Sequence, residues 1–335
     1  MRALIIADPI AGLKADFDTG LALAREALRR GHSVDWCEPT DLLLSGTRIH
    51  CRGWGLKPFA PLTLPEPQWE FSGRPLSEYD TVWVRKDPPF DMDYLSLCWL
   101  LCLEERSTYF LNRPSLLARY HEKMLPLEAV RQGFLEEDEV VPSWMPAGER
   151  LLPKPEDPSG AWITKPWLGH GGRGVRKWES LEQALTQIPA GEKSMTLYQH
   201  YLEDLTRFGD RRIFFLNGRI LGHFCRFPAP GSVKANIAAG GTARFVPMTE
   251  KQAGVAGKVC RFLDHLGIEF AGIDMIGQRI SEINVTATTG FELLKRLRAE
   301  AQTKGLDTGE GLGPMEPPDT LYLKFVEGKL GSPHR

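Results

Sequence analysis

The chain reads Gly272-Ile273-Asp274-Met275-Ile276-Gly277-Gln278-Arg279-Ile280-Ser281-Glu282-Ile283-Asn284-Val285, and this stretch predicts a β-hairpin. Apolar residues alternate with others on both sides of Gly277-Gln278, as in two strands joined by a tight turn. Successive side chains of a strand point to opposite faces, so Glu282 and Asn284 share one face. Asp274 is expected beside them on the neighbouring strand. The hairpin is therefore expected to bring three oxygen-bearing side chains together.

These three side chains favour a magnesium site. Two carboxylates and an amide oxygen, with no His or Cys in the same stretch, are ligands that suit Mg²⁺. Magnesium held in this way commonly serves phosphate chemistry. The alternative is a hairpin whose polar residues simply face water, and the stretch by itself leaves both interpretations open.

The first part of the chain predicts a parallel α/β sheet. Its opening strand–helix–strand pattern favours parallel pairing. Two prolines in Lys86-Asp87-Pro88-Pro89-Phe90-Asp91 end a strand at the edge of the sheet where ligands of α/β proteins bind. The predicted elements are a strand at 3–7, a helix at 18–30, a strand at 33–37, irregular connecting structure at 50–78, a strand at 81–85, and helices at 93–106 and 121–132.

The second part predicts short strands, glycine loops and a few helices. A strand at 161–166 and extended residues at 175–178 flank a glycine-rich connection, Leu168 to Gly174, which we name the glycine flap. Residues 211–216 and 219–224 form a second hairpin around the turn Asn217-Gly218. Helices are predicted at 179–187, 249–266, 291–302 and 319–327.

Composition limits the classes of function. A chain of 335 residues has room for two or three domains, and its net charge of −2 gives no support for binding nucleic acid or a membrane surface. No run approaches the roughly 20 apolar residues that span a bilayer, and the apolar run at 3–7 is too short for a signal peptide. The six cysteines lack Cys-x-x-Cys spacing, so free thiols in a reducing, cytoplasmic protein are expected.

Two lysines and the glycine flap are candidates for phosphate binding. Lys165 precedes the flap directly, and Lys123 lies in a predicted helix. The exposed backbone N–H groups of a segment that contains Gly171 and Gly172 suit phosphate oxygens, and lysines supply point charges. The flap joins strand to strand and lacks the Walker spacing, so neither common nucleotide fingerprint fits. A plain glycine turn beside solvated lysines is the alternative.

A second segment of small residues lies beside cations. Asn236 begins the run Asn236-Ile237-Ala238-Ala239-Gly240-Gly241, which follows Arg226 and Lys234. Small residues permit close approach of a ligand to the backbone, and the cations would neutralise developing phosphate charge. A surface loop with incidental basic residues is the alternative. Gln199-His200-Tyr201-Leu202 ends a strand-like segment and is a candidate to hold a planar base.

In this order, the segments resemble bacterial glutathione synthetases of the ATP-grasp superfamily. The matching pieces run almost end to end, and they are Asp8-Pro9-Ile10-Ala11, Arg85 through Asp91, Asn112-Arg113-Pro114, Glu122-Lys123, Lys165-Pro166 with the flap, Gln199 through Leu202, Gly209-Asp210-Arg211-Arg212, Arg226-Phe227-Pro228, Asn236 through Gly241, Gly272-Ile273-Asp274 and Glu282 through Thr286. The resemblance implies a pre-ATP-grasp parallel-sheet domain at 1–120. It further implies an ATP-grasp fold at 121–310, with a lid at about 140–202 and an antiparallel C-terminal subdomain, and a tail at 311–335.

The resemblance also implies residue roles. Lys123 and Lys165 would contact ATP phosphates, residues 199–202 would hold adenine, and Arg226 with Lys234 would act in catalysis. Mg²⁺ would be held by Asp274, Glu282 and Asn284. The other ATP-binding candidates are Gly171, Gly172, Asp210, Asn236, Gly240 and Gly241, and the substrate-binding candidates are Asp8, Arg85, Asp87, Thr286, Thr289 and Glu292.

Two departures from the family pattern concern the acceptor side. Lys234 stands where the family commonly has Arg, so the charge remains but bidentate recognition is lost. After Thr286 the family typically reads Ser-Pro-Thr and then an arginine, whereas this chain has Ala287-Thr288-Thr289 and Glu292. A carboxylate at 292 would suit a cation-bearing acceptor better than the free carboxylate of glycine.

The implied reaction activates a carboxylate as an acyl phosphate, which an amine then attacks to form an amide. The first expectation is glutathione synthesis from γ-glutamylcysteine and glycine, with ATP and Mg²⁺, in a homo-oligomer (dimer or tetramer). One alternative is a ligase for a different amine or γ-glutamyl peptide, motivated by Ala287 and Glu292. Another is a catalytically silent ATP-binding regulatory protein.

Overall fold

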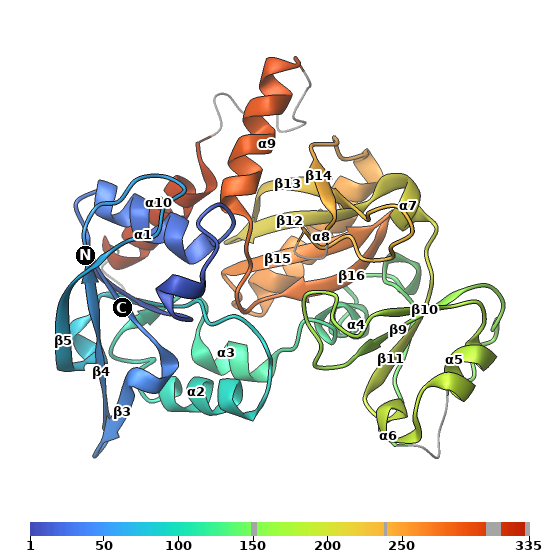
Figure 1. Ribbon diagram of the computed structural model, residues 1–335, viewed down its shortest axis with the longest axis horizontal. Coiled ribbons are helices and arrows are strands. Elements are labelled where there is room, and N and C mark those ends of the chain that lie inside the picture. Colours follow the sequence, from blue (N-terminus) through green and yellow to red (C-terminus); the bar gives the residue numbers. More distant parts are fainter. Residues whose placement is uncertain (149–152, 238–239, 306–315, 332–335) are drawn as a thin grey trace.

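Three β-sheets, each flanked by helices, make up the computed structural model of the chain (Figure 1). It describes residues 1–148, 153–237, 240–305 and 316–331. A seven-stranded N-terminal sheet lies at the left of Figure 1, and a five-stranded sheet lies at the centre and right. A four-stranded sheet, the lid sheet, projects at the lower right. No helix of the described residues is long and apolar enough to cross a membrane.

The N-terminal sheet has a parallel core, as predicted. Its strand order is β3-β4-β2-β1-β6-β7, and β5 also pairs with β4. The parallel strands are β1 (Arg2–Ile6), β2 (Ser33–Cys37), β6 (Thr81–Val84) and β7 (Tyr109–Phe110), and the antiparallel ones are β3 (Leu42–Ser45), β4 (Arg48–Leu56) and β5 (Pro67–Pro75). Ala3 and Ile5 of β1 pack with α1 (Thr19–Arg29), while Leu4 and Ile6 pack with α2 (Met92–Cys102) and α3 (Pro114–Arg119). Burial on both faces explains why β1 is apolar throughout.

The prediction of irregular structure at 50–78 is wrong. Strands β4 and β5 pair from His50 opposite Pro75 to Leu56 opposite Pro67. Two register shifts break the alternation of side chains that would have revealed them. Position 55 inside β4 requires glycine, because a Cβ there would stand 1.9 Å from the ring of Trp69. Glycine in a strand thus marks a close approach here, where periodicity suggested a loop.

The central sheet is antiparallel, with the order β14-β13-β12-β15-β16. Its strands are β12 (Asp210–Leu216), β13 (Arg219–Phe227), β14 (Thr242–Arg244), β15 (Phe270–Ile276) and β16 (Arg279–Asn284). Both predicted hairpins, β12–β13 and β15–β16, are confirmed. Ile213 and Phe215 face α8 (Glu250–His265), and Phe214 faces α9 (Phe291–Thr303), so each face of the sheet has its own helix.

The lid sheet is antiparallel, with the order β10-β9-β11-β8. Its strands are β8 (Ser143–Trp144), β9 (Trp162–Pro166), β10 (Arg176–Trp178) and β11 (Thr196–His200), and the helices near it are α5 (Leu181–Gln187), α6 (Ala190–Lys193) and α7 (Asp204–Phe208). The helix predicted at 121–132 is shorter than expected, since α4 runs over Leu125–Arg131 with Pro126 in its first turn. Lys123 therefore precedes the helix and does not lie in it.

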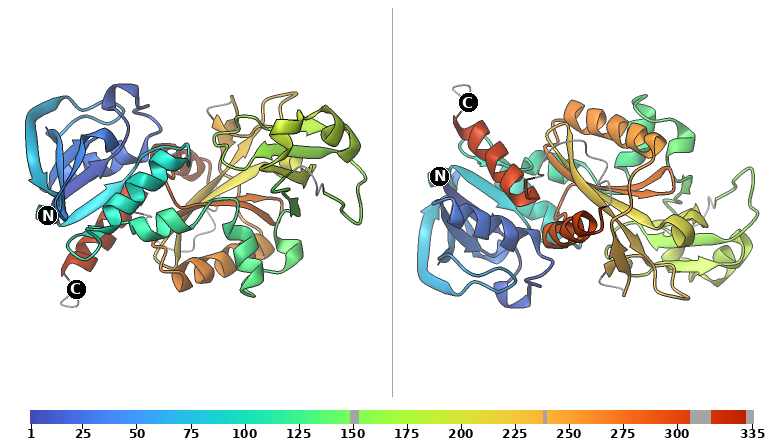
Figure 2. Two further views of the ribbon diagram at one scale, coloured as in Figure 1. Left: turned by 90° about the horizontal axis from the view of Figure 1, so that it is seen from below. Right: turned by 90° about the horizontal axis from the view of Figure 1, so that it is seen from above.

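The last helix, α10 (Pro318–Gly331), belongs to the N-terminal core. Tyr322, Leu323 and Val326 are fully buried and pack with α1 and Trp83. In both views of Figure 2, α10 lies at the same end of the molecule as the N-terminus. The predicted boundary at 310 lies outside the described residues, and the described part of the predicted tail is a packed helix.

Asn112 connects the N-terminal sheet to the central sheet. Its buried Nδ2 donates to the carbonyl oxygens of Phe270 (2.6 Å) and Val285 (3.0 Å), and its Oδ1 accepts from the N–H groups of Glu269 (3.0 Å) and Phe270 (2.9 Å). It follows β7 directly, and its partners lie at the start of β15 and just after β16. One side chain thereby fixes the hairpin of Asp274 against the N-terminal sheet.

Replacing Asn112 with Ala should destabilise the protein by roughly 3 kcal/mol, because buried groups left without a partner cost about 1–3 kcal/mol each. Urea unfolding of the full chain measures the change. The matched control is Gln132→Ala, an exposed amide bonded to Glu128, which should cost less than about 0.5 kcal/mol. Equal, small losses for both variants would contradict the connecting role of Asn112.

Candidate active site

The hairpin β15–β16 carries the predicted metal ligands in the expected register. Asp274 stands opposite Glu282, and Gly272 stands opposite Asn284. The turn contains Gly277, whose φ of +60° favours glycine, and a Cβ there would also meet the carboxylate of Asp204 at 2.1 Å. The three oxygen-bearing side chains thus come from two paired strands.

Two arginines hold the carboxylate of Asp274. Arg212 on β12 lies opposite Asp274 on β15, and it donates from Nε (2.6 Å) and Nη2 (3.0 Å) in a bidentate pair. Arg226 on β13 lies 2.9 Å from Asp274 and also bonds to Asp210 across β12–β13. Pairing of neighbouring strands therefore builds this ionic cluster.

Burial and charge set the ionisation of the cluster. Burial opposes ionisation of Asp274, but Arg212 and Arg226 outweigh it and hold its pKa at about 2. Burial raises the pKa of Asp210 to about 6 against the attraction of Arg226. Its Oδ1 is buried and has no hydrogen-bond partner among the described residues. A buried oxygen of this kind leaves a position for a polar ligand.

Two lysines connect the lid sheet and its flap to this cluster. Lys165 at the end of β9 donates from Nζ to Glu282 Oε1 (2.9 Å). Lys123 Nζ donates to Glu122 Oε1 (2.7 Å) and to the carbonyl oxygen of Gly169 in the flap (2.6 Å). Burial opposes ionisation of Glu282, and Lys165 with Lys123 lowers its pKa nevertheless. The lysines predicted to meet phosphates thus contact protein oxygens in this structure.

Two cavities meet at the cluster. The first lies under the flap and is lined by Lys123, Lys165, Gly171, Gly172, residues 199–202, Asp210, Lys234 and Asn236. The second, of about 620 Å³, is lined by Asp87, Glu122, Asn284, Ala287 and Thr289. Both share His170, Gly171, Arg173, Arg226, Asn236, Asp274 and Glu282. The two cavities therefore lie next to each other, and we call the residues that line both the shared wall.

The first cavity is narrow in this conformation. Its volume of about 120 Å³ is below the roughly 300–1,000 Å³ of small-molecule sites. The contacts of Lys165 with Glu282 and of Lys123 with Gly169 draw the lid and flap onto the cluster. A nucleotide must displace these contacts to occupy the cavity.

The predicted base-binding segment forms one wall of the first cavity. Gln199 is buried and donates to Ser143 Oγ at 2.7 Å. The ring of His200 lies 4.1 Å from that of Trp162, between centroids. Gly240 and Gly241, by contrast, line neither cavity.

The predicted substrate residues divide into two groups. Asp87 and Thr289 line the second cavity, and burial raises the pKa of Asp87 to about 6. Asp8 instead pairs with Lys86 at 3.0 Å and accepts from the N–H of Asp87. Arg85 is buried and donates to the Thr288 carbonyl oxygen (2.6 Å), so it supports the loop that carries Ala287 and Thr289. Thr286 bonds to Asn284 Oδ1 at 3.1 Å.

Glu292, a predicted substrate residue, is paired with two cations. Its carboxylate bonds to Arg25 of α1 and to Lys295 (2.7 Å), and it lines neither of the two cavities. It is the first-turn acid of α9, and it attaches that helix to α1. Short-range sequence patterns could not reveal this partner, because Arg25 lies 267 positions away.

Sequence reasoning missed two residues of the cluster. Arg212 donates to both carboxylate oxygens of Asp274. The carboxylate of Glu122 accepts from Lys123 and from Asn284. Both stand inside the motifs that carried the family resemblance. Their roles could not be predicted from the sequence, because only the folded structure shows which carboxylate or amide each of them contacts.

The donor set fits magnesium. Asp274, Glu282 and Asn284 offer hard oxygen atoms from adjacent positions of one hairpin. In the described ranges no group of three His, Cys, Asp or Glu side chains is assembled around a common point. The cations Lys165 and Arg212 balance the charge that the carboxylates would present to the ion.

Comparison with known proteins decides the family. The model of the prokaryotic glutathione synthetase N-terminal domain matches residues 1–118, and that of the prokaryotic glutathione synthetase ATP-grasp domain matches residues 149–299. The glutathione synthetase of Parasynechococcus marenigrum (strain WH8102) is 32% identical over 90% of this chain and 95% of its own length. That of Gloeobacter violaceus is 35% identical over 87% of this chain and 90% of its own length. The chain belongs to the prokaryotic glutathione synthetase family. This confirms the resemblance drawn from the motifs.

Solved structures agree on the ATP-grasp fold. D-cycloserine synthetase superposes with a TM-score of 0.58 at 15% identity, over 91% of this chain and all of its own. D-alanine–D-alanine ligase from Bacillus anthracis gives 0.53 at 11% identity, over 98% of this chain and 99% of its own. As a member of the glutathione synthetase family, the chain is an ATP-grasp ligase that uses ATP and Mg²⁺ to form a carbon–nitrogen bond.

Replacing Glu282 with Gln should abolish Mg²⁺-dependent ADP release, because a hard anionic ligand is lost. The variant should remain folded, since glutamine keeps the shape of the side chain and an oxygen that can accept from Lys165 Nζ. Coupled ADP assays over a Mg²⁺ series and urea unfolding give the two readouts.

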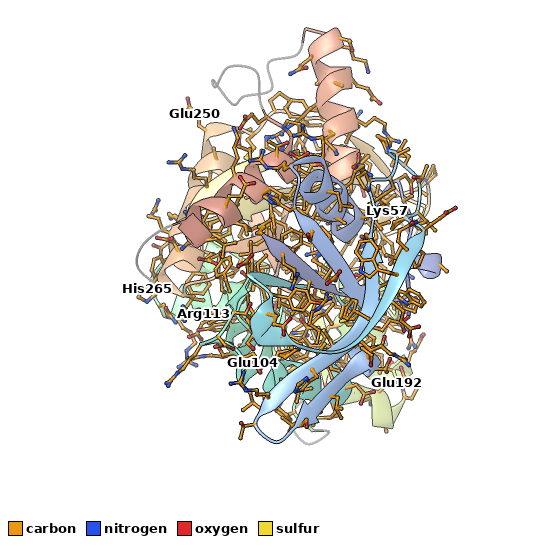
Figure 3. The ribbon with its side chains drawn as sticks, turned by 90° about the vertical axis from the view of Figure 1, so that its left-hand side faces the viewer. Lys57, Glu104, Arg113, Glu192, Glu250 and His265 are labelled. Carbon is orange, nitrogen blue, oxygen red and sulfur yellow. The ribbon has the colours of Figure 1, made fainter. Side chains whose placement is uncertain are left out.

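The matched control is Glu192→Gln, which also removes an acid paired with a cation of the lid sheet, Arg176. Glu192 lies on the outside of the molecule, at the lower right of Figure 3. It should leave activity unchanged. Retained activity in Glu282→Gln would contradict the metal assignment.

Proposed function

We propose that this ligase makes glutathione from γ-glutamylcysteine and glycine, and that the two adjacent cavities hold its substrates. The observation that carries the proposal is their shared wall, in which Arg226 and Asp274 line both cavities. ATP would lie under the flap, with its phosphates toward the shared wall. The γ-glutamyl peptide would lie in the second cavity, with its terminal carboxylate toward the same point.

The charged residues of the shared wall suit phosphoryl transfer. Arg226 is buried between Asp210 and Asp274, and although burial opposes its charge, the two carboxylates raise its pKa above the ordinary range. It therefore remains a cation where negative charge develops on the transferring phosphoryl group and later on the tetrahedral intermediate. Lys123 and Lys165 would exchange their protein partners for phosphate oxygens. Bound Mg²⁺, held by Asp274, Glu282 and Asn284, would neutralise phosphate charge and orient the group.

The flap would protect the intermediate from water. An acyl phosphate hydrolyses readily, so closure of the site has a chemical purpose. Gly171 and Gly172 adopt φ values of +59° and +75°, and a Cβ on Gly172 would stand 3.0 Å from Asn236 Oδ1. These glycines let the flap backbone lie close to Asn236 and to the aliphatic part of Lys234. Lys234 supplies a cation at that edge of the first cavity.

Glycine is the acceptor that the structure favours. A cationic acceptor would need an unpaired carboxylate at position 292. Glu292 is already paired with Arg25 and Lys295. Ala287 and Thr289 face the second cavity and add no charge to it. A small, uncharged loop suits a small amine.

A panel of amines with γ-glutamylcysteine should give the highest kcat/KM with glycine, measured by ADP release and by mass of the product. Glu292→Gln should leave this preference unchanged to within about twofold and lower the unfolding midpoint. Preference for a cationic amine that disappears in Glu292→Gln would restore the alternative acceptor. ATP binding without any product across the panel would favour the silent regulatory protein.

A homo-oligomer in a reducing, cytoplasmic setting completes the proposal. All six cysteines are free thiols, and five of them are buried. Helix α2 exposes Met92 and Trp99 by 61% and 54%, and Leu103, directly after its last residue, is 57% exposed. Apolar side chains gathered on one side of a helix are typical of contact surfaces, and a second copy of the chain supplies the same apolar residues.

Trp99→Glu should shift the protein toward monomer, because it places a charge at the centre of this apolar side. Sedimentation velocity of the full chain at micromolar concentration measures the change. The control is Leu64→Glu, which adds the same charge at an exposed leucine outside α2. A mass unchanged by Trp99→Glu would exclude α2 as the contact.

A further inference from the structure

Glu122 lies against the edge of the hairpin that carries the metal ligands. Its carbonyl oxygen accepts from the N–H of Ile283 at 2.9 Å. Ile283 is the residue between Glu282 and Asn284, and β16 is the last strand of the central sheet. The short segment before α4 thus adds a hydrogen bond to β16 at Ile283, between the two predicted metal ligands of that strand.

The side chain of Glu122 reaches two groups of the candidate site. Oε1 accepts from Lys123 Nζ at 2.7 Å, and Oε2 accepts from Asn284 Nδ2 at 3.4 Å, a long bond. The side chain is 15% exposed, and that of Lys123 is 2% exposed. One carboxylate therefore touches both a predicted metal ligand and a predicted phosphate ligand.

This contact determines which way the Asn284 amide points. An ionised carboxylate only accepts hydrogen bonds, so the amide must turn Nδ2 toward Glu122. The opposite end, Oδ1, accepts from the N–H and the hydroxyl of Thr286, both at 3.1 Å. An acceptor on one side and donors on the other select a single orientation. The oxygen, which is the atom that binds a cation, is thereby held on the side away from Glu122.

A third carboxylate at this place is costly for the fold. Burial, and then the charge of Glu282, raises the pKa of Glu122. Carboxylates so close together repel one another, and Lys123 offsets only part of this cost. Charge balance for Lys123 alone does not require the second oxygen to face Asn284.

We propose that Glu122 is a positioning residue for the ATP–magnesium site, orienting the Asn284 amide and the Lys123 ammonium together. The inference rests on the proposed function, which assigns Asn284 to Mg²⁺ and Lys123 to phosphate. It adds a residue that sets the geometry of two others, the proposed metal ligand Asn284 and the proposed phosphate ligand Lys123. It also joins the segment before α4 to the cation site through one side chain.

Glu122→Gln tests this role with little change of shape. The glutamine has one acceptor oxygen in place of two and carries no charge. Isothermal titration with ATP at a series of Mg²⁺ concentrations, without the γ-glutamyl substrate, measures binding apart from turnover. The Mg²⁺ concentration that gives half-maximal ATP binding should rise about tenfold, the size typical for residues that orient metal ligands.

Glu128→Gln is the matched control, because Glu128 lies on α4 and its carboxylate accepts from Gln132. It should leave the Mg²⁺ dependence unchanged. A purely structural role for Glu122 would lower the unfolding midpoint without moving that dependence. An unchanged Mg²⁺ dependence in Glu122→Gln overturns the proposal.

A double-mutant cycle with Asn284→Ala separates the two levels of the argument. If Glu122 acts through Asn284, adding Glu122→Gln to Asn284→Ala should produce no further rise in the Mg²⁺ requirement. Fully additive effects would overturn the positioning role. If Asn284→Ala itself leaves the Mg²⁺ dependence unchanged, the metal assignment fails, whatever Glu122 does.

Discussion

The buried carboxylate of Asp274 is the constraint on which this site depends. Breaking a buried ion pair by removing one partner is strongly destabilising, so the cations around Asp274 must remain in register. Arg212 comes from β12, the strand next to β15, and Arg226 comes from β13, one strand further along the sheet. Strand pairing brings both cations to the same carboxylate, so the central sheet has a chemical reason to keep its order and its alignment.

Segments distant in the sequence converge on the same hairpin. Asn112 fastens its base to the N-terminal sheet, Glu122 pairs with the edge of β16, and Lys165 reaches it from the lid. These contacts differ in strength. The bonds of Asn112 are neutral and buried, while the ion pair of Lys165 is partly exposed. The hairpin is thus held by buried hydrogen bonds on the N-terminal side and contacted by the lid sheet on the other.

Local patterns predicted the parts of the fold whose forces are local. The hairpins β12–β13 and β15–β16 were found from alternation and from the Asn217-Gly218 and Gly277-Gln278 turns. Helix α8 begins at the capping box of Thr249 with Gln252, a signal within four residues. The pair β4–β5 was missed, since its register shifts and its close contact of Gly55 with Trp69 leave no periodic pattern.

By itself the sequence determined the family, the hairpin and the set of oxygen donors, because these follow from residue type and short spacing. Only the tertiary structure decided which charges meet. Glu292, whose carboxylate had suggested a cationic acceptor, is paired with Arg25 in the fold. The fold also brings Arg212 to Asp274 and Glu122 to Asn284. Electrostatic attraction acts through space over a few ångströms, and residues more than 160 positions apart become neighbours only when the sheets assemble. The chemistry of the donors was therefore readable in the chain, while their partners were set by the fold.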